Sequence, residues 1–187
     1  MNISLRKLTT IAMFSSVSVV LSLLGFNLPF ISFLKIDFSE TPAVLATFWG
    51  GSLCGILVVL IKNLVVLPFT RTVGIGEISN FILGCSLVLP AGIIFKKTQS
   101  IFLSSLGGIL SSAFSSIIFN YFIIFPMYFA IVEKEAILSL YRVICPYIQN
   151  SLEAILVINL PLTIFKSTLS IIFATFIVKR IKIIRQY

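Results

Sequence analysis

The 187-residue sequence has no histidine, only three cysteines and few charges, which make up 11% of its residues. A soluble domain carries about 25% charged residues, so this composition excludes an ordinary water-soluble surface. Hydrophobic residues account for 58% of the chain, and no stretch is polar enough for a linker or a disordered tail. The sequence therefore predicts one membrane-embedded domain over residues 1–187.

Metal-binding and catalytic patterns are also missing. Cys54, Cys85 and Cys145 lie far apart with no histidine to share a metal, so we expect buried thiols and neither a metal site nor a disulfide framework. The six carboxylates are not clustered, and the signatures of zinc proteases, serine hydrolases and phosphate-binding loops are absent. Few groups remain for acid–base chemistry, which argues against an enzyme.

Acidic residues are scarce: the sequence has six acids and fourteen bases, which gives a formal net charge of +8. The bases are scattered between apolar runs, which argues against nucleic acid as a partner and favours the lipid bilayer. The positive-inside rule predicts a multi-pass cell-membrane protein with both termini in the cytoplasm. Eight bases then flank the cytoplasmic ends of the spans with no acid among them: Arg6, Lys7, Lys96, Lys97, Lys179, Arg180, Lys182 and Arg185.

Long apolar runs are abundant, and a helix needs about 20 such residues to cross the hydrocarbon core. The first run extends over 8–34, and Asn27 and Pro29 within it predict a helix that ends near residue 26, followed by a loop over 27–39. The run 98–132 is too short for two crossings and predicts one long helix before an outer loop. Further helices are expected over 78–95 and from about Ser151 to Val178.

The run 41–70 is either one long helix or two short helices broken near Gly50, Gly51 and Gly55. Two helices place Lys96 and Lys97 on the same side as the N-terminus, so the charge distribution favours them. Each has roughly 16 residues, or about 24 Å. The predicted fold class is an all-α integral membrane protein with six transmembrane helices and a long first outer loop.

Lys166 is the clearest polar residue inside an apolar run, 13 residues from both Glu153 and Lys179. A charge at that depth costs a few kcal/mol, so it needs a partner or a ligand. A snorkelling or internally paired lysine is one interpretation, and a donor facing a ligand cavity is the one we favour. Asn159 lies seven residues earlier and shares its face.

Asn120 lies among bulky apolar residues beside Tyr121. It either bonds a neighbouring helix or, with Tyr121, receives a flat heteroaromatic ring whose edge carries a donor next to an acceptor. Glu77 and Asn80 share a face at the start of the fourth helix, where an acid is also favoured by the helix dipole alone.

Two further predictions concern the ends of the short helices. Lys62 is placed near the outer end of the third helix, where a lysine can snorkel. Ser39 is predicted to cap the second helix, with Pro42 in its first turn.

Several stretches occur in a recognisable order from about residue 8 to 180. The most specific are Lys35-Ile36-Asp37-Phe38-Ser39 and Gly76-Glu77-Ile78-Ser79-Asn80-Phe81; Pro42-Ala43, Lys62-Asn63, Pro90-Ala91-Gly92, Asn120-Tyr121-Phe122, Asn159 and Phe165-Lys166 support them. Together they resemble the substrate-binding (S) component of energy-coupling factor (ECF) vitamin transporters, most closely its riboflavin-specific branch. The resemblance implies a six-helix fold with an outer ligand cavity, and a subunit that does no chemistry and needs no cofactor.

The resemblance also implies riboflavin as the transported substrate, and as partners a transmembrane coupling (T) protein and two cytoplasmic ATPases. Ala12 and Ser16, small residues four apart, fall where the family keeps an alanine-rich docking motif. Carried over, the binding residues are Asn80, Asn120 and Lys166 at the polar ring edge, Glu77 and Asn159 at the ring edge or ribityl hydroxyls, and Tyr121 and Trp49 on the ring faces. An S component for another vitamin, a small intramembrane enzyme and a channel remain as alternatives.

Overall fold

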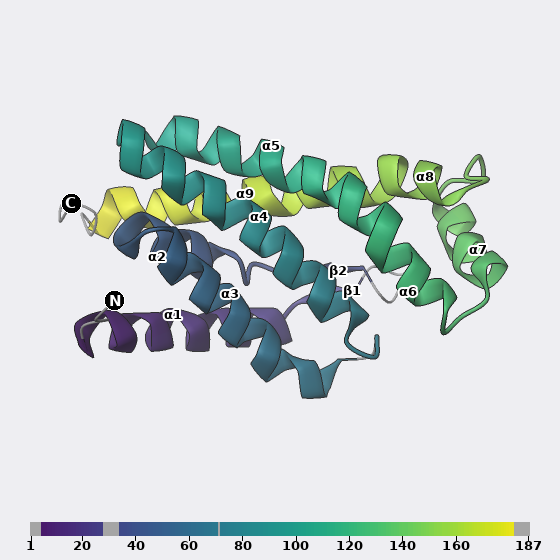
Figure 1. Cartoon of the computed structure of the whole chain (residues 1–187), viewed down its shortest axis with the longest axis horizontal. Helices are drawn as coiled ribbons and strands as arrows, with labels where there is room; N and C mark the ends of the chain where they lie inside the picture. The colour runs from purple at the N-terminus through teal and green to yellow at the C-terminus, as the bar shows by residue number, and fades with distance from the viewer. Residues whose placement is uncertain (1–4, 28–33, 71, 182–187) are drawn as a thin grey trace.

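The computed structural model describes residues 5–27, 34–70 and 72–181, which form an elongated helical bundle (Figure 1). These ranges contain five helices long and apolar enough to cross a membrane, so the predicted all-α membrane class is confirmed. They are α1 (Leu5–Leu23), α3 (Ser52–Val66) with the 3-10 turn Leu67–Phe69, α4 (Ile75–Thr98), α5 (Ile101–Phe119) continuing through Asn120–Ile124 into α6 (Phe125–Phe129), and α8 (Ser151–Ala154) continuing through Ile155–Asn159 into α9 (Leu160–Ile181).

The run 41–70 folds as two helices, as the charge distribution predicted. α2 (Thr41–Gly50) ends at Gly51, whose φ of 88° lies in the region that glycine adopts without strain. Its 10 residues rise only about 15 Å, so α2 is shorter than expected and reaches about halfway through the hydrocarbon core. Gly55 lets α3 pack closely on it, because a Cβ there would lie 1.9 Å from Thr47 Oγ1.

The first loop contains a short hairpin. β1 (Phe26–Asn27) pairs antiparallel with β2 (Lys35–Ile36), so that Phe26 lies opposite Ile36. The predicted helix-ending residue Pro29 lies outside the described residues. This hairpin brings residues 34–36 back toward the bundle.

The segment after residue 132 is not the plain outer loop that the sequence predicted. It forms α7 (Lys134–Ile144), an amphipathic helix whose buried residues are Ile137, Leu138 and Tyr141. Arg142 pairs with Glu135, and its Nε donates to the Ile148 carbonyl at 2.9 Å. The following helix starts at Ser151, as predicted, with Asn150 and Glu153 forming a capping box.

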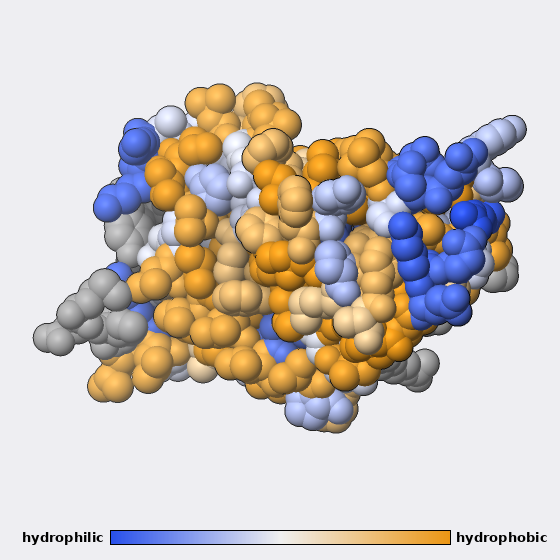
Figure 2. Space-filling model, turned by 45° about the vertical axis from the view of Figure 1, so that its right-hand side comes forward, coloured by the Kyte–Doolittle hydropathy of each residue, from blue (hydrophilic) through white to orange (hydrophobic). Residues whose placement is uncertain are grey.

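Charge separates the two ends of the bundle. The first described turn of α1 and the last turn of α9 lie at the end where α4 turns into α5 (Figure 1), and we call this the basic end. Its described bases are Arg6, Lys7, Lys96, Lys97, Lys179 and Arg180, whereas Lys182 and Arg185 lie outside the described residues. Between the two ends Figure 2 shows a predominantly hydrophobic surface on the face that it draws. The exposed large hydrophobic residues of the described chain include Phe114, Phe173 and Phe176. Such a belt is suited to lipid contact.

Two apolar clusters form the core. The larger surrounds α2 and joins α1, α3, α4 and α9, with Val44, Phe48 and Leu87 among its buried members. The smaller lies beneath α7, where Phe125 packs on Tyr141 with ring centroids 5.7 Å apart.

Candidate functional site

A pocket of about 80 Å³ lies in the half of the bundle far from the basic end. β2, α4, the α5–α6 helix, α7 and the last helix all contribute to it. Its apolar lining comprises Leu34, Leu83, Ile124, Phe125, Ile137 and Leu162, and its polar side chains are Lys35, Ser79, Asn80, Asn120, Tyr128, Tyr141, Asn159, Thr163 and Lys166. A mostly apolar pocket with a few convergent polar groups is typical of a small-molecule site.

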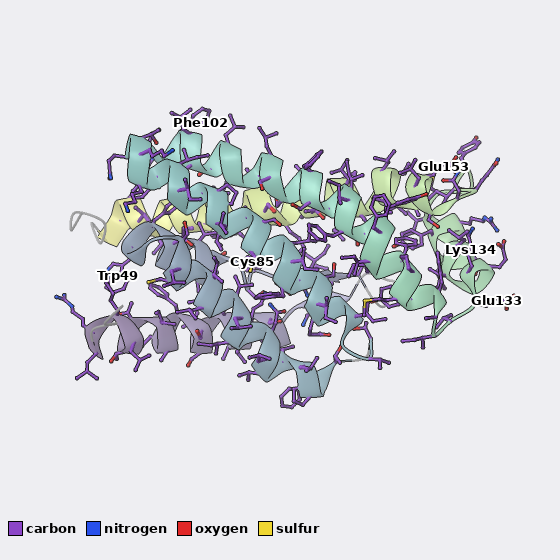
Figure 3. The ribbon with its side chains drawn as sticks, viewed as in Figure 1. Trp49, Cys85, Phe102, Glu133, Lys134 and Glu153 are labelled. Carbon is purple, nitrogen blue, oxygen red and sulfur yellow. The ribbon has the colours of Figure 1, made fainter. Side chains whose placement is uncertain are left out.

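Four of the seven predicted ligand residues line this pocket: Asn80, Asn120, Asn159 and Lys166. The other three do not. Glu77 lies one turn before Asn80 and accepts a hydrogen bond of 3.3 Å from the Thr72 hydroxyl. Tyr121 is 44% exposed and packs edge-on against Phe122, and Trp49 lies near the end of α2 at the basic end (Figure 3).

Asn120 and Asn159 occupy equivalent irregularities in two helices. Asn120 begins one π-helical turn, Asn120–Ile124, and Asn159 ends the other, Ile155–Asn159. A proline follows each turn, Pro126 in one helix and Pro161 in the other. A proline cannot donate a hydrogen bond to the carbonyl four residues earlier, and its ring clashes with that carbonyl. For Pro126 and Pro161 these carbonyls belong to residues 122 and 157, which lie inside the π turns. The prolines thus provide a local cause for the turns, which often occur at functional sites.

Neighbouring side chains fix the role of the Asn120 amide. Its Nδ2 donates to the Ser116 carbonyl at 2.7 Å and to Ser116 Oγ at 3.1 Å. Ser116 Oγ lies 3.0 Å from Thr163 Oγ1, which donates to the Asn159 carbonyl at 2.8 Å. Because both Nδ2 hydrogens are used within the protein, the side-chain oxygen of Asn120 is the acceptor available to a ligand.

Tyr141 gives Asn159 the opposite role. The Tyr141 hydroxyl, on a fully buried side chain, donates to Asn159 Oδ1 at 2.9 Å. Burial raises the pKa of Tyr141, against the opposing effect of this bond, so the phenol is a proton donor at neutral pH. With its oxygen occupied, Asn159 presents its amide nitrogen as a donor.

Lys62 and Ser39 differ from their predicted roles. Lys62 does not snorkel, because it is only 2% exposed and its Nζ donates to Ser39 Oγ at 3.1 Å. Ser39 does not cap α2, since Glu40 holds that position without a side-chain cap bond. Its hydroxyl and backbone N–H instead donate to Asp37 Oδ1 at 2.6 and 3.1 Å. Pro42 does lie in the first turn, as predicted.

Asp37 is a buried carboxylate close to this lysine. Burial alone opposes its ionisation, but the charges of Lys166 and Lys62 and the bonds from Ser39 outweigh burial and lower the pKa of Asp37. The segment also contacts α1, because Ser18 Oγ donates to the Ser39 carbonyl and Lys35 Nζ lies 3.4 Å from Ser22 Oγ. The loop that supplies Leu34 and Lys35 to the pocket is therefore tied to α1 and α3.

The predicted docking residues lie on the exposed side of α1. Ala12 and Ser16 are both exposed, and the Ser16 hydroxyl donates to the Ala12 carbonyl at 2.9 Å. The buried residues of α1 are Ile11, Ser15, Ser18 and Ser22. Ala12 and Ser16 thus present two small, exposed side chains that a neighbouring helix can approach.

Sequence reasoning missed several pocket residues, notably Tyr141, Tyr128, Thr163 and Lys35. Thr163 was detectable, because it lies between Asn159 and Lys166 at helical spacing from each. The sequence predicts an outer loop where Tyr141 lies, and only the amphipathic pattern of α7 indicates its burial. As for metals, the described ranges contain no group of three or more His, Cys, Asp or Glu residues that would hold one.

Comparison with known proteins identifies related transporters. The model of the family described as the substrate-specific component of ECF transporters matches residues 6–181. The riboflavin transporter RibU of Staphylococcus aureus (strain TCH60) is 36% identical over 127 residues, covering 66% of this chain and 67% of that protein. The riboflavin transporter FmnP of Bacillus subtilis (strain 168) is 38% identical over 130 residues, covering 66% and 68%.

A solved structure of the S component of a bacterial ECF transporter is similar over almost the whole chain. The TM-score is 0.74 at 28% sequence identity, with 97% of this chain and 98% of that chain covered.

Proposed function

The chain belongs to the substrate-specific (S) components of ECF transporters, and from this premise we propose that it binds riboflavin in the pocket beneath α7 and presents it for import. The observation that carries the proposal is the pair of asparagines whose roles are fixed by their neighbours, Asn120 as acceptor and Asn159 as donor. Both relatives described above are riboflavin transporters by name. A transport subunit also agrees with a sequence that lacks a nucleotide-binding motif.

The polar edge of the isoalloxazine ring carries an N–H between two carbonyl groups. The Asn120 oxygen accepts from this N–H, while Asn159 Nδ2 and Lys166 Nζ donate to the carbonyls. Asn80 and Ser79 supply further polar groups from α4. The ring faces then meet apolar and aromatic walls such as Phe125 and Tyr128.

Room for a three-ring ligand has to be made on binding. The pocket measures about 80 Å³, whereas typical ligand sites measure about 300–1,000 Å³. Two of its walls, β2 and α7, lie outside the candidate transmembrane helices. We expect these two walls to move outward when riboflavin enters.

ATP-driven import requires partners, which we propose to be a transmembrane coupling (T) protein and two cytoplasmic ATPases. Ala12 and Ser16 form the proposed contact with the coupling protein, because they lie on the exposed face of α1. The positive-inside rule places the basic end, with both termini, in the cytoplasm. The pocket then opens toward the outer face.

Ligand binding to the purified full-length protein tests the proposal. Titration calorimetry against riboflavin, thiamine and biotin should give saturable binding of riboflavin alone, at one molecule per chain. Asn120→Leu should weaken binding, whereas Tyr121→Phe, outside the pocket, should not. Saturable binding of thiamine or biotin without riboflavin binding would contradict the proposal and indicate another vitamin.

A further inference from the structure

A second and larger pocket, of about 780 Å³, lies at the basic end. It forms where α2 ends and α3 begins, against the last turns of α4 and the first turns of α1. Gly50 and Gly51 leave the break between α2 and α3 without side chains, and a Cβ at Gly51 would meet no atom within 4 Å. The space therefore follows from the break that separates the two short helices.

The wall of this pocket is apolar and firmly packed. Phe48 and Phe95 are buried, with ring centroids 5.0 Å apart, while Leu53 and Ile93 are exposed beside them. Ser52 Oγ donates to the Leu89 carbonyl at 2.9 Å, which fixes the start of α3 against α4. Packed helices and exposed aliphatic side chains of this kind suit a hydrocarbon chain.

The rim of the pocket is cationic. Lys96 and Lys97 lie exposed in the last turn of α4, and Lys7 of α1 is also a lining residue. None of the six acids of the chain is among the residues that line the pocket. The one acid within the helices α1 to α4, Glu77, lies in the first turn of α4, at the opposite end of that helix from Lys96 and Lys97. The lining itself therefore carries a net positive charge.

We propose that this pocket binds an anionic glycerophospholipid from the membrane leaflet that surrounds the basic end. The phosphate contacts Lys96 and Lys97, and an acyl chain lies along Leu53 and Ile93. Charge complementarity carries the assignment, because basic pockets between transmembrane helices at headgroup depth bind anionic lipid heads. A zwitterionic lipid is disfavoured, since its own cation faces the lysines. The inference is independent of which vitamin the protein transports.

The only tryptophan of the chain reports on this site. Trp49 lies between the lining residues Phe48 and Gly50, at the basic end in Figure 3. The full-length, ligand-free protein in phosphatidylcholine vesicles is titrated with phosphatidylglycerol brominated on its acyl chains, and quenching of Trp49 is compared with quenching by brominated phosphatidylcholine. The anionic lipid should bind more tightly, by about fivefold for each lysine engaged.

Two double variants remove the same charge from the same end. Lys96→Gln with Lys97→Gln should bring the lipid preference close to one, with riboflavin binding unchanged as a check on folding. Lys179→Gln with Arg180→Gln should keep the preference, because neither residue lines the pocket.

Three results would overturn the inference. Equal quenching of the native protein by the two lipids means that the site does not select charge. If the two double variants lose the preference for anionic lipid equally, the preference comes from the general surface charge of this end. If millimolar glycerol phosphate reverses the quenching, the pocket is a site for soluble anions. Native protein that prefers the anionic lipid but does not bind riboflavin would contradict the proposed function and leave this inference standing.

Discussion

Lys62 on α3 donates a hydrogen bond of 3.1 Å to the hydroxyl of Ser39, at the end of the first loop. The same hydroxyl donates to Asp37, and the Ser39 carbonyl accepts from Ser18 on α1. A buried cation thus joins a transmembrane helix to the loop that supplies Leu34 and Lys35 to the ligand pocket. Residues that touch no ligand are therefore expected to influence ligand affinity.

Replacing Lys62 by methionine tests this connection. Lys62→Met leaves the buried Asp37 carboxylate with only Lys166 of the two lysines whose charges lower its pKa, and breaking such a buried arrangement costs up to about 3–5 kcal/mol. Both thermal stability and riboflavin affinity should fall. Adding Asp37→Asn should restore part of the stability, whereas Lys179→Met should change neither property. A fully stable Lys62→Met protein would show that the lysine is not needed to hold the loop.

Lys166→Ala removes a donor from the pocket itself. Loss of a charged hydrogen bond should weaken riboflavin binding by about 1.5 to 3 kcal/mol, or roughly ten- to hundredfold, in calorimetry of the folded variant. Lys179→Ala, near the end of the same helix, is the matched control. Unchanged affinity would return Lys166 to an internally paired or snorkelling role.

Tyr141→Phe separates orientation of Asn159 from ligand contact. Without the hydroxyl, Asn159 Oδ1 loses a buried donor, at a cost of about 1–3 kcal/mol. The amide is then free to turn, so riboflavin affinity should fall along with the unfolding temperature. Tyr121→Phe removes a hydroxyl from an exposed tyrosine and should alter neither. A Tyr141→Phe protein with native affinity would show that Asn159 needs no such partner.

Protonation of Asp37 at acid pH should destabilise the folded first loop. Its pKa is lowered in the folded protein, so its stabilising effect is complete above the unfolded pKa of about 3.9 and is lost as the pH falls through the lower folded value. Between about pH 5 and 8, Asp37 should not make the unfolding temperature, measured in detergent, depend on pH. Below about pH 4, Asp37→Asn should lose less stability than the native protein. Parallel acid curves for the two proteins would contradict this assignment.

Bulky residues on the exposed side of α1 should separate binding from uptake. Ala12→Leu or Ser16→Leu enlarges one of these two small, exposed side chains without touching the pocket, so riboflavin affinity should be retained. Uptake by cells or vesicles containing the assembled complex should fall, because close helix approach is blocked. Met13→Leu, a conservative change at a neighbouring exposed position, is the control. Loss of binding and uptake together would indicate misfolding instead.

Sequence alone revealed the features that depend on composition and local periodicity. The membrane class follows from too few charges to cover a soluble surface. The division of 41–70 into two helices follows from the side on which Lys96 and Lys97 must lie, and the last helix from about Ser151 follows from its apolar run. Asn80, Asn120, Asn159 and Lys166 stood out because polar groups are costly in apolar helices.

Tertiary structure decided which of these polar groups meet. Trp49 and Tyr121 are aromatic like the residues of a flavin site, but neither lines the pocket. Trp49 lies at the basic end (Figure 3), and Tyr121 is exposed although its neighbour Asn120 is a lining residue. Tyr141 and Ser39 acquire their roles from partners 18 and 23 residues away, Asn159 and Lys62, and no local pattern encodes a contact at that distance. The sequence determines which segments are apolar enough to enter the membrane and which polar residues are costly there. Only packing determines which donor faces which acceptor, because that pairing depends on distances between helices.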